Sequence, residues 1–192
     1  NKPAGLVVHP GNGNYTGTLV HGVAHHLLQQ KLELPPDTSS PDFATDEAAI
    51  PRPGLVHRLD KDTTGVMVLG KTEEAMTALS MQFFERTVER RYTALVWGDL
   101  ETDGTIEGHI GRNRRNRRIQ AVYPDGEEGK HAVTHYSVLE RLGPVTLTEC
   151  KLETGRTHQI RVHMEHTGHP LFGDVSYGGN RAVKGVRGGK YQ

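Results

Sequence analysis

Residues 92–97 read Tyr-Thr-Ala-Leu-Val-Trp, a run of aromatic, β-branched and apolar side chains that is typical of a β-strand. Comparable runs occupy Val133–Leu139 and Val145–Leu152, and a short mixed run at Gln159–Met164 also favours a strand. These runs do not alternate regularly with helices. They therefore predict an α+β domain with a largely antiparallel or mixed sheet and a few flanking helices.

Two segments carry helix signals. Residues 72–90 begin with Thr72, a residue type that caps helices, and continue with two glutamates that the helix dipole favours. Apolar residues then recur at helical spacing, and arginines follow near the expected C-terminal end. A shorter helix is expected over 19–30. Between the two, residues 35–53 contain many prolines, which predicts a loop.

Length and composition exclude several classes of protein. The 192 residues correspond to one domain. Because 23 basic residues balance 23 acidic ones, the composition excludes a protein that binds nucleic acid through overall positive charge. A single cysteine, Cys150, excludes a disulfide framework and favours a reducing compartment. No apolar run approaches the length of a membrane span and no signal peptide is visible, so we expect a cytoplasmic protein without a membrane partner.

One polar stretch is a candidate for catalysis. Residues 57–65 read His-Arg-Leu-Asp-Lys-Asp-Thr-Thr-Gly, and the apolar residues that follow predict a strand starting at Gly65. Asp60 lies between the basic residues Arg58 and Lys61, which favour its ionised form. An ionised carboxylate on a loop can act as a nucleophile or a base. The alternative is a turn in which Asp and Thr side chains only cap backbone groups.

A second stretch, residues 154–163, reads Thr-Gly-Arg-Thr-His-Gln-Ile-Arg-Val-His. If residues 158–163 form a strand, Arg161 faces away from the apolar Ile160 and Val162. Arginine can bind a carboxylate through two parallel hydrogen bonds, which suits a site in a cleft. A surface salt bridge is the alternative.

A third stretch is strongly basic. Residues 112–118 contain five arginines, namely Arg112, Arg114, Arg115, Arg117 and Arg118. Arginine and asparagine together suit contacts with phosphates and base edges, so the stretch predicts binding to nucleic acid. A solvated hairpin tip is the alternative.

The 12 histidines gather mainly in residues 21–26 and 158–169. Their spacing does not match the helical His-Glu-x-x-His pattern, and no cysteine accompanies them. We therefore predict no metal site.

Taken together, these stretches resemble the RluA-type pseudouridine synthases, and most of all the RluD branch that modifies large-subunit ribosomal RNA. Residues 57–65 resemble the family's signature, and residues 154–163 resemble its arginine segment. Asn1–Leu6 resembles its opening segment, and Tyr92 matches its tyrosine strand. The resemblance implies that residues 1–192 form the catalytic domain. It also leads us to expect a domain truncated at both ends and an S4 domain missing from its N-terminal side.

The resemblance implies the reaction and the roles of the residues. Uridine in structured RNA is isomerised to pseudouridine after base flipping, with no cofactor. Asp60 attacks C1′ or removes the proton on C2′, Arg161 pairs with Asp60, and Tyr92 lies against the uracil ring. Arg58 fills the gap left by the flipped base. The remaining RNA contacts are assigned to Lys2, Arg112, Arg114, Arg115, Arg117, Arg118 and Arg156.

RNA is the expected partner, with ribosomal RNA preferred over transfer RNA and no obligate protein partner. Two alternatives stay open: an RNA-binding module without activity, and a glycosidase that uses Asp60 and Asp62. On an extended chain these two carboxylates would lie roughly 6.5–7 Å apart, which suits an inverting glycosidase. The single tryptophan and the arginine-rich stretch argue against a glycan substrate.

Overall fold

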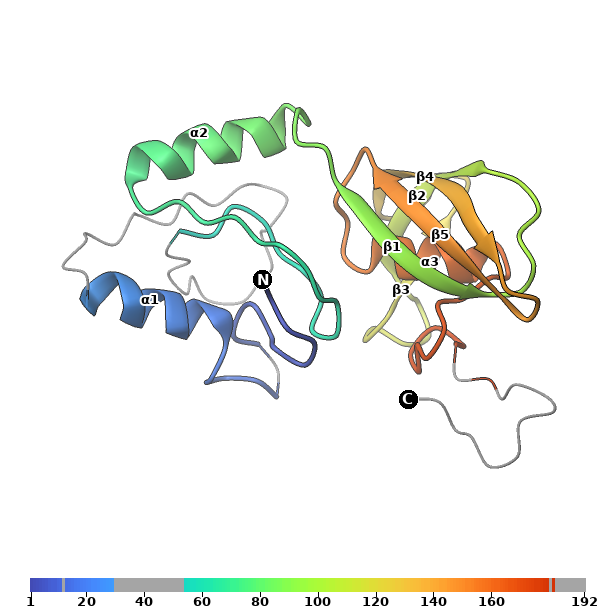
Figure 1. The fold of residues 1–192 in the computed structure, drawn as a ribbon, viewed down its shortest axis with the longest axis horizontal. Helices are drawn as coiled ribbons and strands as arrows, with labels where there is room; N and C mark the ends of the chain where they lie inside the picture. The colour runs from blue at the N-terminus through green and yellow to red at the C-terminus, as the bar shows by residue number, and fades with distance from the viewer. Residues whose placement is uncertain (12, 30–53, 180, 182–192) are drawn as a thin grey trace. The chain divides into compact units, whose positions relative to one another are not determined.

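The computed structural model describes residues 1–11, 13–29, 54–179 and 181. The chain divides into two compact units, Asn1–Val88 and Glu89–Gln192. Helices α1 and α2 belong to the first unit, and the sheet with α3 belongs to the second (Figure 1). The proline-rich loop predicted over residues 35–53 lies outside the described residues.

The second unit is built on a five-stranded, fully antiparallel sheet with the order β1-β5-β4-β2-β3. Its strands are β1 (Arg91–Trp97), β2 (Gly104–Arg112), β3 (Gln120–Tyr123), β4 (Lys130–Arg141) and β5 (Val145–Leu152). The three strands predicted from aromatic and β-branched runs are confirmed as β1, β4 and β5. The predicted α+β class is confirmed as well, and the sheet is strongly curled (Figure 1).

The segment predicted as a strand at 159–164 is instead helix α3 (Gln159–His166). Its two β-branched residues favour a strand locally, but tertiary contacts override this preference. The buried Gln159 side chain accepts a hydrogen bond of 2.9 Å from the Arg156 amide and donates one of 2.9 Å to the Val133 carbonyl. The start of the helix is thereby fixed to β4.

Two buried clusters hold α3 against the sheet. One joins Met164 of α3 to Ala94, Val96, Leu100, Ile106 and Cys150. The other joins Val162 of α3 to Ile110, Ala132 and Tyr177. Each cluster combines a helix residue with residues from several strands, so apolar burial fixes the position of α3.

The first unit contains α1 (Leu19–Gln29) and α2 (Glu73–Phe84). Helix α1 confirms the prediction over 19–30. Helix α2 begins as predicted, because Thr72 Oγ1 accepts a hydrogen bond of 3.2 Å from the Ala75 amide. It ends earlier than predicted, and Arg86 beyond it has a φ of 60°, outside the range of a right-handed helix. None of the helices in the described part of the chain is long and apolar enough to span a bilayer.

The strand predicted to start at Gly65 does not form. Residues 65–69 pair with the rest of the unit at two isolated points, Gly65 with Lys2 and Leu69 with Leu55. An apolar run needs a continuous neighbouring strand to form a ladder, and this one pairs only at its ends. The residues between the two points therefore remain a loop.

Candidate active site

Asp60 lies in a loop of the first unit that is tied to the N-terminal segment. The Lys2 amide donates a hydrogen bond of 2.7 Å to the Gly65 carbonyl, and the Gly65 amide donates one of 3.2 Å in return. The Lys2 Nζ atom donates a third, of 2.8 Å, to the Lys61 carbonyl. The stretch that follows Asp60 is therefore held at both ends by one residue.

The neighbours of Asp60 anchor it without covering it. Leu59 is buried, Asp60 is half-buried and Arg58 is exposed. The Asp60 carbonyl accepts a hydrogen bond of 3.2 Å from the Thr63 amide, which closes a turn. A carboxylate in such a position is fixed by its backbone and can still meet a substrate.

Lys2 has a different role from the phosphate contact that the sequence predicts. The residue is only 3% exposed. Its Nζ atom donates to three backbone carbonyl oxygens, those of Pro3, Leu6 and Lys61. Burial lowers the pKa of Lys2, and the charges of Asp62 and Asp60 partly oppose this shift. An ammonium enclosed in this way holds the loop, so we correct the prediction that it meets RNA.

Tyr92 lies in β1, opposite Cys150 of β5. It is partly buried against the cluster that contains Ala94, Val96 and Met164. The sheet thus supports the ring while part of it stays accessible. An aromatic ring held in this way can stack on a flat base.

Arg161 lies on α3 and is bound by Asp174, a carboxylate that the sequence alone did not connect with it. Its Nε donates a hydrogen bond of 2.7 Å to Asp174 Oδ2, and its Nη2 donates one of 3.1 Å to Oδ1. Its Cζ lies 4.9 Å from the centre of the Tyr177 ring. Burial alone would raise the pKa of Asp174, but the hydrogen bonds and charge of Arg161, together with hydrogen bonds from the Ser176 and Tyr177 amides, outweigh it and lower that pKa. No spacing rule connects these two residues, so only the fold identifies the pair.

The three predicted catalytic residues come from both units. Tyr92 and Arg161 belong to the second unit, and Asp60 belongs to the first. The pairing of Arg161 with Asp60, which the resemblance implies, stays a prediction.

The arginine-rich stretch forms the turn between β2 and β3, which we call the arginine turn (residues 113–119). The Asn113 side chain accepts hydrogen bonds from the amides of Arg115 and Asn116, at 2.9 and 3.0 Å. The Asn113 amide donates to the Ile119 carbonyl across the turn, at 3.0 Å. The turn is therefore an ordered hairpin tip and not a loose loop.

The arginines of this turn are not equivalent. Arg114 is paired with Glu127 and Glu128, at 2.9 and 2.7 Å. Within the described residues, three others are exposed and make no ion pair: Arg115, Arg117 and Arg118. Away from the turn, Arg156 is partly buried and its Nε donates to the His131 carbonyl at 3.0 Å. The predicted RNA contacts thus differ widely in their accessibility.

A family model described as RNA pseudouridylate synthase matches residues 1–166, a range that includes Asp60, Tyr92 and Arg161. The chain belongs to this family. It is 50% identical over 178 residues to the ribosomal large subunit pseudouridine synthase D of Nitrosomonas europaea, covering 93% of this chain and 46% of the relative. It is also 50% identical over 186 residues to the protein of the same name from Pseudomonas aeruginosa, covering 97% and 52%. The family predicted from the motifs is confirmed.

Solved structures agree with this assignment. Human RNA pseudouridylate synthase domain containing 4 superimposes with a TM-score of 0.64 at 29% identity, over 92% of this chain and 63% of that one. Human RNA pseudouridylate synthase domain containing 1 gives a TM-score of 0.61 at 35% identity, over 65% and 55%. The chain spans about half the length of the curated bacterial relatives. These comparisons give no support to the glycosidase or to the inactive RNA-binding module.

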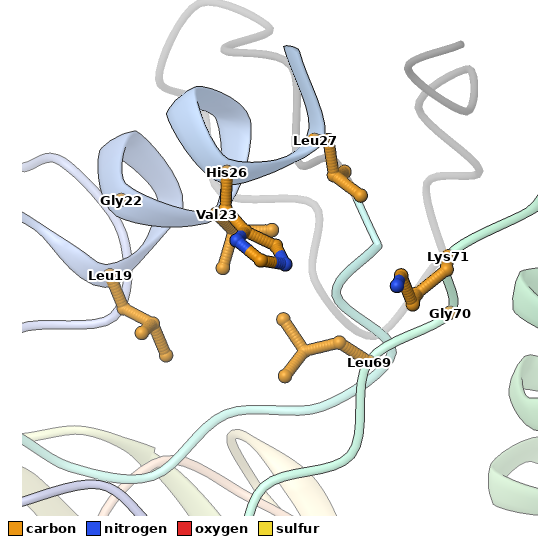
Figure 2. A pocket seen from close by; sticks show the side chains of 8 residues that line it. All are labelled: Leu19, Gly22, Val23, His26, Leu27, Leu69, Gly70 and Lys71. Atoms are coloured by element: carbon orange, nitrogen blue, oxygen red, sulfur yellow. The ribbon is translucent and has the colours of Figure 1, made fainter. Parts of the chain in front are cut away.

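The chain also has a pocket of about 350 Å³ in its first unit, between α1 and residues 69–71 (Figure 2). Its lining is Leu19, Gly22, Val23, His26, Leu27, Leu69, Gly70 and Lys71. The walls are mainly apolar, which does not suit a polyanionic RNA, and none of the predicted catalytic residues lines it. We therefore do not assign the substrate to this pocket.

The histidines of the chain lie on several different elements of both units. In the part of the chain that the structure describes, no three His, Cys, Asp or Glu side chains gather in a way that could hold a metal ion. His163 is fully buried, and His158 binds the Tyr177 hydroxyl through Nδ1 at 2.8 Å. These two histidines therefore serve the packing and hydrogen bonding of the second unit.

Proposed function

We propose that this chain isomerises uridine to pseudouridine in large-subunit ribosomal RNA in the cytoplasm. The observation that carries the proposal is the half-buried carboxylate of Asp60, presented on a loop that Lys2 holds at both ends. The loop lies inside the range that matches the family model. Transfer RNA is the competing substrate.

The reaction breaks the bond from uracil N1 to ribose C1′ and forms a bond from C5 to C1′. The proton on C5 is lost and N1 gains one, so no atom or electron is gained overall. A carboxylate near the sugar is the group that this reaction needs. Asp60 either attacks C1′ or removes the proton on C2′ to leave a glycal, and both routes restore the free carboxylate.

Three residues support this chemistry in the proposal. Arg161 pairs with Asp60 and orients its carboxylate. Tyr92 lies against the uracil ring and takes part in proton transfer at C5. Arg58, which is exposed two positions before Asp60, occupies the space left by the flipped base. Flipping costs a few kcal/mol and is easiest in a loop or bulge of the RNA.

The arginine turn supplies phosphate contacts in this proposal. Its exposed members that make no ion pair among the described residues, Arg115, Arg117 and Arg118, stand on an ordered hairpin tip, so their charges are concentrated in one place. Such contacts bind RNA without regard to its sequence. Arg112 is also exposed, and Arg156 is partly buried.

The test compares Asp60→Asn with Asp62→Asn in the full-length protein. We expect Asp60→Asn to abolish pseudouridine formation in large-subunit ribosomal RNA and to keep RNA affinity within about tenfold, because charge elsewhere carries binding. Asp62 is exposed in the same loop, so the matched Asp62→Asn variant should stay active. Turnover by Asp60→Asn would end the assignment. Wild-type protein that binds RNA without modifying it would be an RNA-binding module.

A further inference from the structure

The Arg161 guanidinium is held from two directions by residues of the loop that follows α3. Asp174 binds its Nε and Nη2 through both carboxylate oxygens, at 2.7 and 3.1 Å. The Tyr177 ring lies 4.9 Å from its Cζ. The side chains of Arg161 and Asp174 are only 22% and 8% exposed, so this pair is far less hydrated than a surface salt bridge.

Asp174 is itself fixed in place. Its Oδ1 accepts hydrogen bonds from the amides of Ser176 and Tyr177, at 3.0 and 3.3 Å. Its carbonyl accepts one of 2.7 Å from the Gly179 amide, and the Gly179 carbonyl accepts one of 2.6 Å from the Trp97 indole. The carboxylate is thus anchored through a closed loop to strand β1.

Tyr177 is anchored as firmly. It is 4% exposed and packs in the cluster with Val162 of α3. Its hydroxyl accepts a hydrogen bond of 2.8 Å from the Gln120 amide, so its own proton is available to His158 Nδ1, also at 2.8 Å. Gln120 is the first residue of β3, directly after the arginine turn. The ring beside Arg161 is therefore connected to the base of the turn that we assign to RNA.

We propose that Asp174 and Tyr177 are positioning residues for the pseudouridine synthase reaction, which act by fixing the guanidinium of Arg161. This inference rests on the proposed function, in which Arg161 orients Asp60. An arginine side chain has several rotatable bonds, and an unsupported one would sample many positions. Two carboxylate hydrogen bonds and an aromatic face restrict it to one, before any substrate binds.

The two oxygens of Asp174 allow its roles to be separated. Oδ1 holds the loop amides of Ser176 and Tyr177 and also accepts a hydrogen bond from Arg161 Nη2, whereas among the described residues Oδ2 accepts only from Arg161 Nε. Asp174→Asn can keep the carbonyl oxygen on the loop amides and place an amide NH₂ against Nε. That variant therefore keeps the loop, but it removes the hydrogen bond to Nε and the negative charge that hold Arg161.

The exposed pair Asp99–Arg141 provides a matched control in the same unit. It has the same two-oxygen geometry, but both side chains are nearly half exposed. Asp99→Asn makes the identical chemical change far from Arg161 in the sequence. We expect Asp174→Asn in the full-length protein to lower kcat by about tenfold to a hundredfold with KM for ribosomal RNA within about threefold, and Asp99→Asn to change neither.

A measurement that does not need activity completes the test. The Nε–H resonance of Arg161, assigned by its loss in Arg161→Lys, should be protected from solvent exchange in the wild type and exposed in Asp174→Asn. Lost protection with unchanged kcat would overturn the proposal and leave the proposed function intact. Unchanged protection would overturn it as well. A wild-type protein without activity would instead reject the proposed function, whatever the resonance shows.

Discussion

The Lys2 ammonium donates a hydrogen bond of 2.8 Å to the carbonyl of Lys61, which lies 59 positions later in the chain. Lys61 directly follows Asp60, so the start of the chain holds the loop that presents the proposed catalytic carboxylate. The same ammonium bonds two other carbonyls, those of Pro3 and Leu6. Lys2 thus connects two segments that are distant in sequence.

Lys2→Met should therefore destabilise the first unit and disturb Asp60. Hydrogen bonds from a charged donor are worth about 1.5–3 kcal/mol, and Met leaves three carbonyls without this donor. Because the cost of burying the ammonium offsets much of this gain, we expect the free energy of unfolding to fall by about 2 kcal/mol. We expect kcat to fall with it, as measured by urea denaturation and single-turnover assays.

Lys61→Met is the matched control for this change. Lys61 is exposed and contributes only its backbone carbonyl to Lys2, so the variant should unfold within about 0.5 kcal/mol of the wild type. If Lys2→Met weakened RNA binding while stability and kcat stayed normal, Lys2 would be the phosphate contact that the sequence predicts.

The arginine turn gives a second prediction. Replacing Arg115, Arg117 and Arg118 by Ala should weaken RNA binding strongly at moderate salt, because these side chains are exposed and unpaired among the described residues. Each lost phosphate contact should reduce the slope of log affinity against log salt by about one. The maximal rate on saturating RNA should change little. Fluorescence titrations at several salt concentrations measure both quantities.

Arg114→Ala is the control in the same turn. Arg114 is already paired with Glu127 and Glu128, so its removal should change the salt slope less than the removal of an unpaired neighbour. Wild-type affinity and slope in the triple variant would mean that the turn is only a solvated tip. A loss of maximal rate at unchanged affinity would place the turn in the active site.

An element of the fold could be predicted where its local sequence pattern determines its secondary structure. It could not be predicted where tertiary contacts determine it. Strand β5 alternates between buried and more exposed positions, so it could be predicted. Strand β2 carries glycine, threonine and histidine at most positions and gains its strand character from pairing with β3 and β4. Helix α3 was predicted as a strand because its β-branched residues favour a strand locally. The buried hydrogen bonds of Gln159, which fix the start of the helix, depend on the tertiary structure and cannot be derived from the local sequence.

The same distinction between local sequence pattern and tertiary contact applies to the residues of the candidate site. Asp60 could be singled out as a candidate because its charged neighbours and the family signature both lie within a few residues of it, and its catalytic role stays a prediction. Asp174 could not be linked to Arg161, because their contact depends on the path of the loop after α3. Lys2 was misassigned because a lysine near the start of a chain is usually exposed, and only the fold shows its burial.

The reaction should proceed without added metal. It is an isomerisation that needs no Lewis acid, and the histidine spacing does not match a metal site. Full-length protein treated with EDTA, then assayed in magnesium-free buffer on a short prefolded RNA, should keep its rate. Recovery of a lost rate by zinc alone would contradict this prediction. The short RNA controls for the effect of magnesium on RNA folding.

His163 should make the stability of the second unit depend on pH. The side chain is 0% exposed, and burial, with a smaller contribution from the charge of His166, lowers its pKa from 6.5 to about 4. The unfolded chain then binds more protons than the folded one between these values. The stabilisation is therefore complete above about pH 6.5 and is lost as the pH falls towards 4.

This difference in pKa corresponds to about 2 kcal/mol at pH 5. Urea denaturation at pH 7.5 and pH 5.0 should show that His163→Gln loses less stability on acidification than the wild type, by about that amount. The comparison between variants cancels the contribution of the carboxylates, which titrate in both. His25→Gln, an exposed change on α1, should retain the wild-type difference between the two pH values. If His163→Gln lost as much stability as the wild type, the acid sensitivity would arise from other groups.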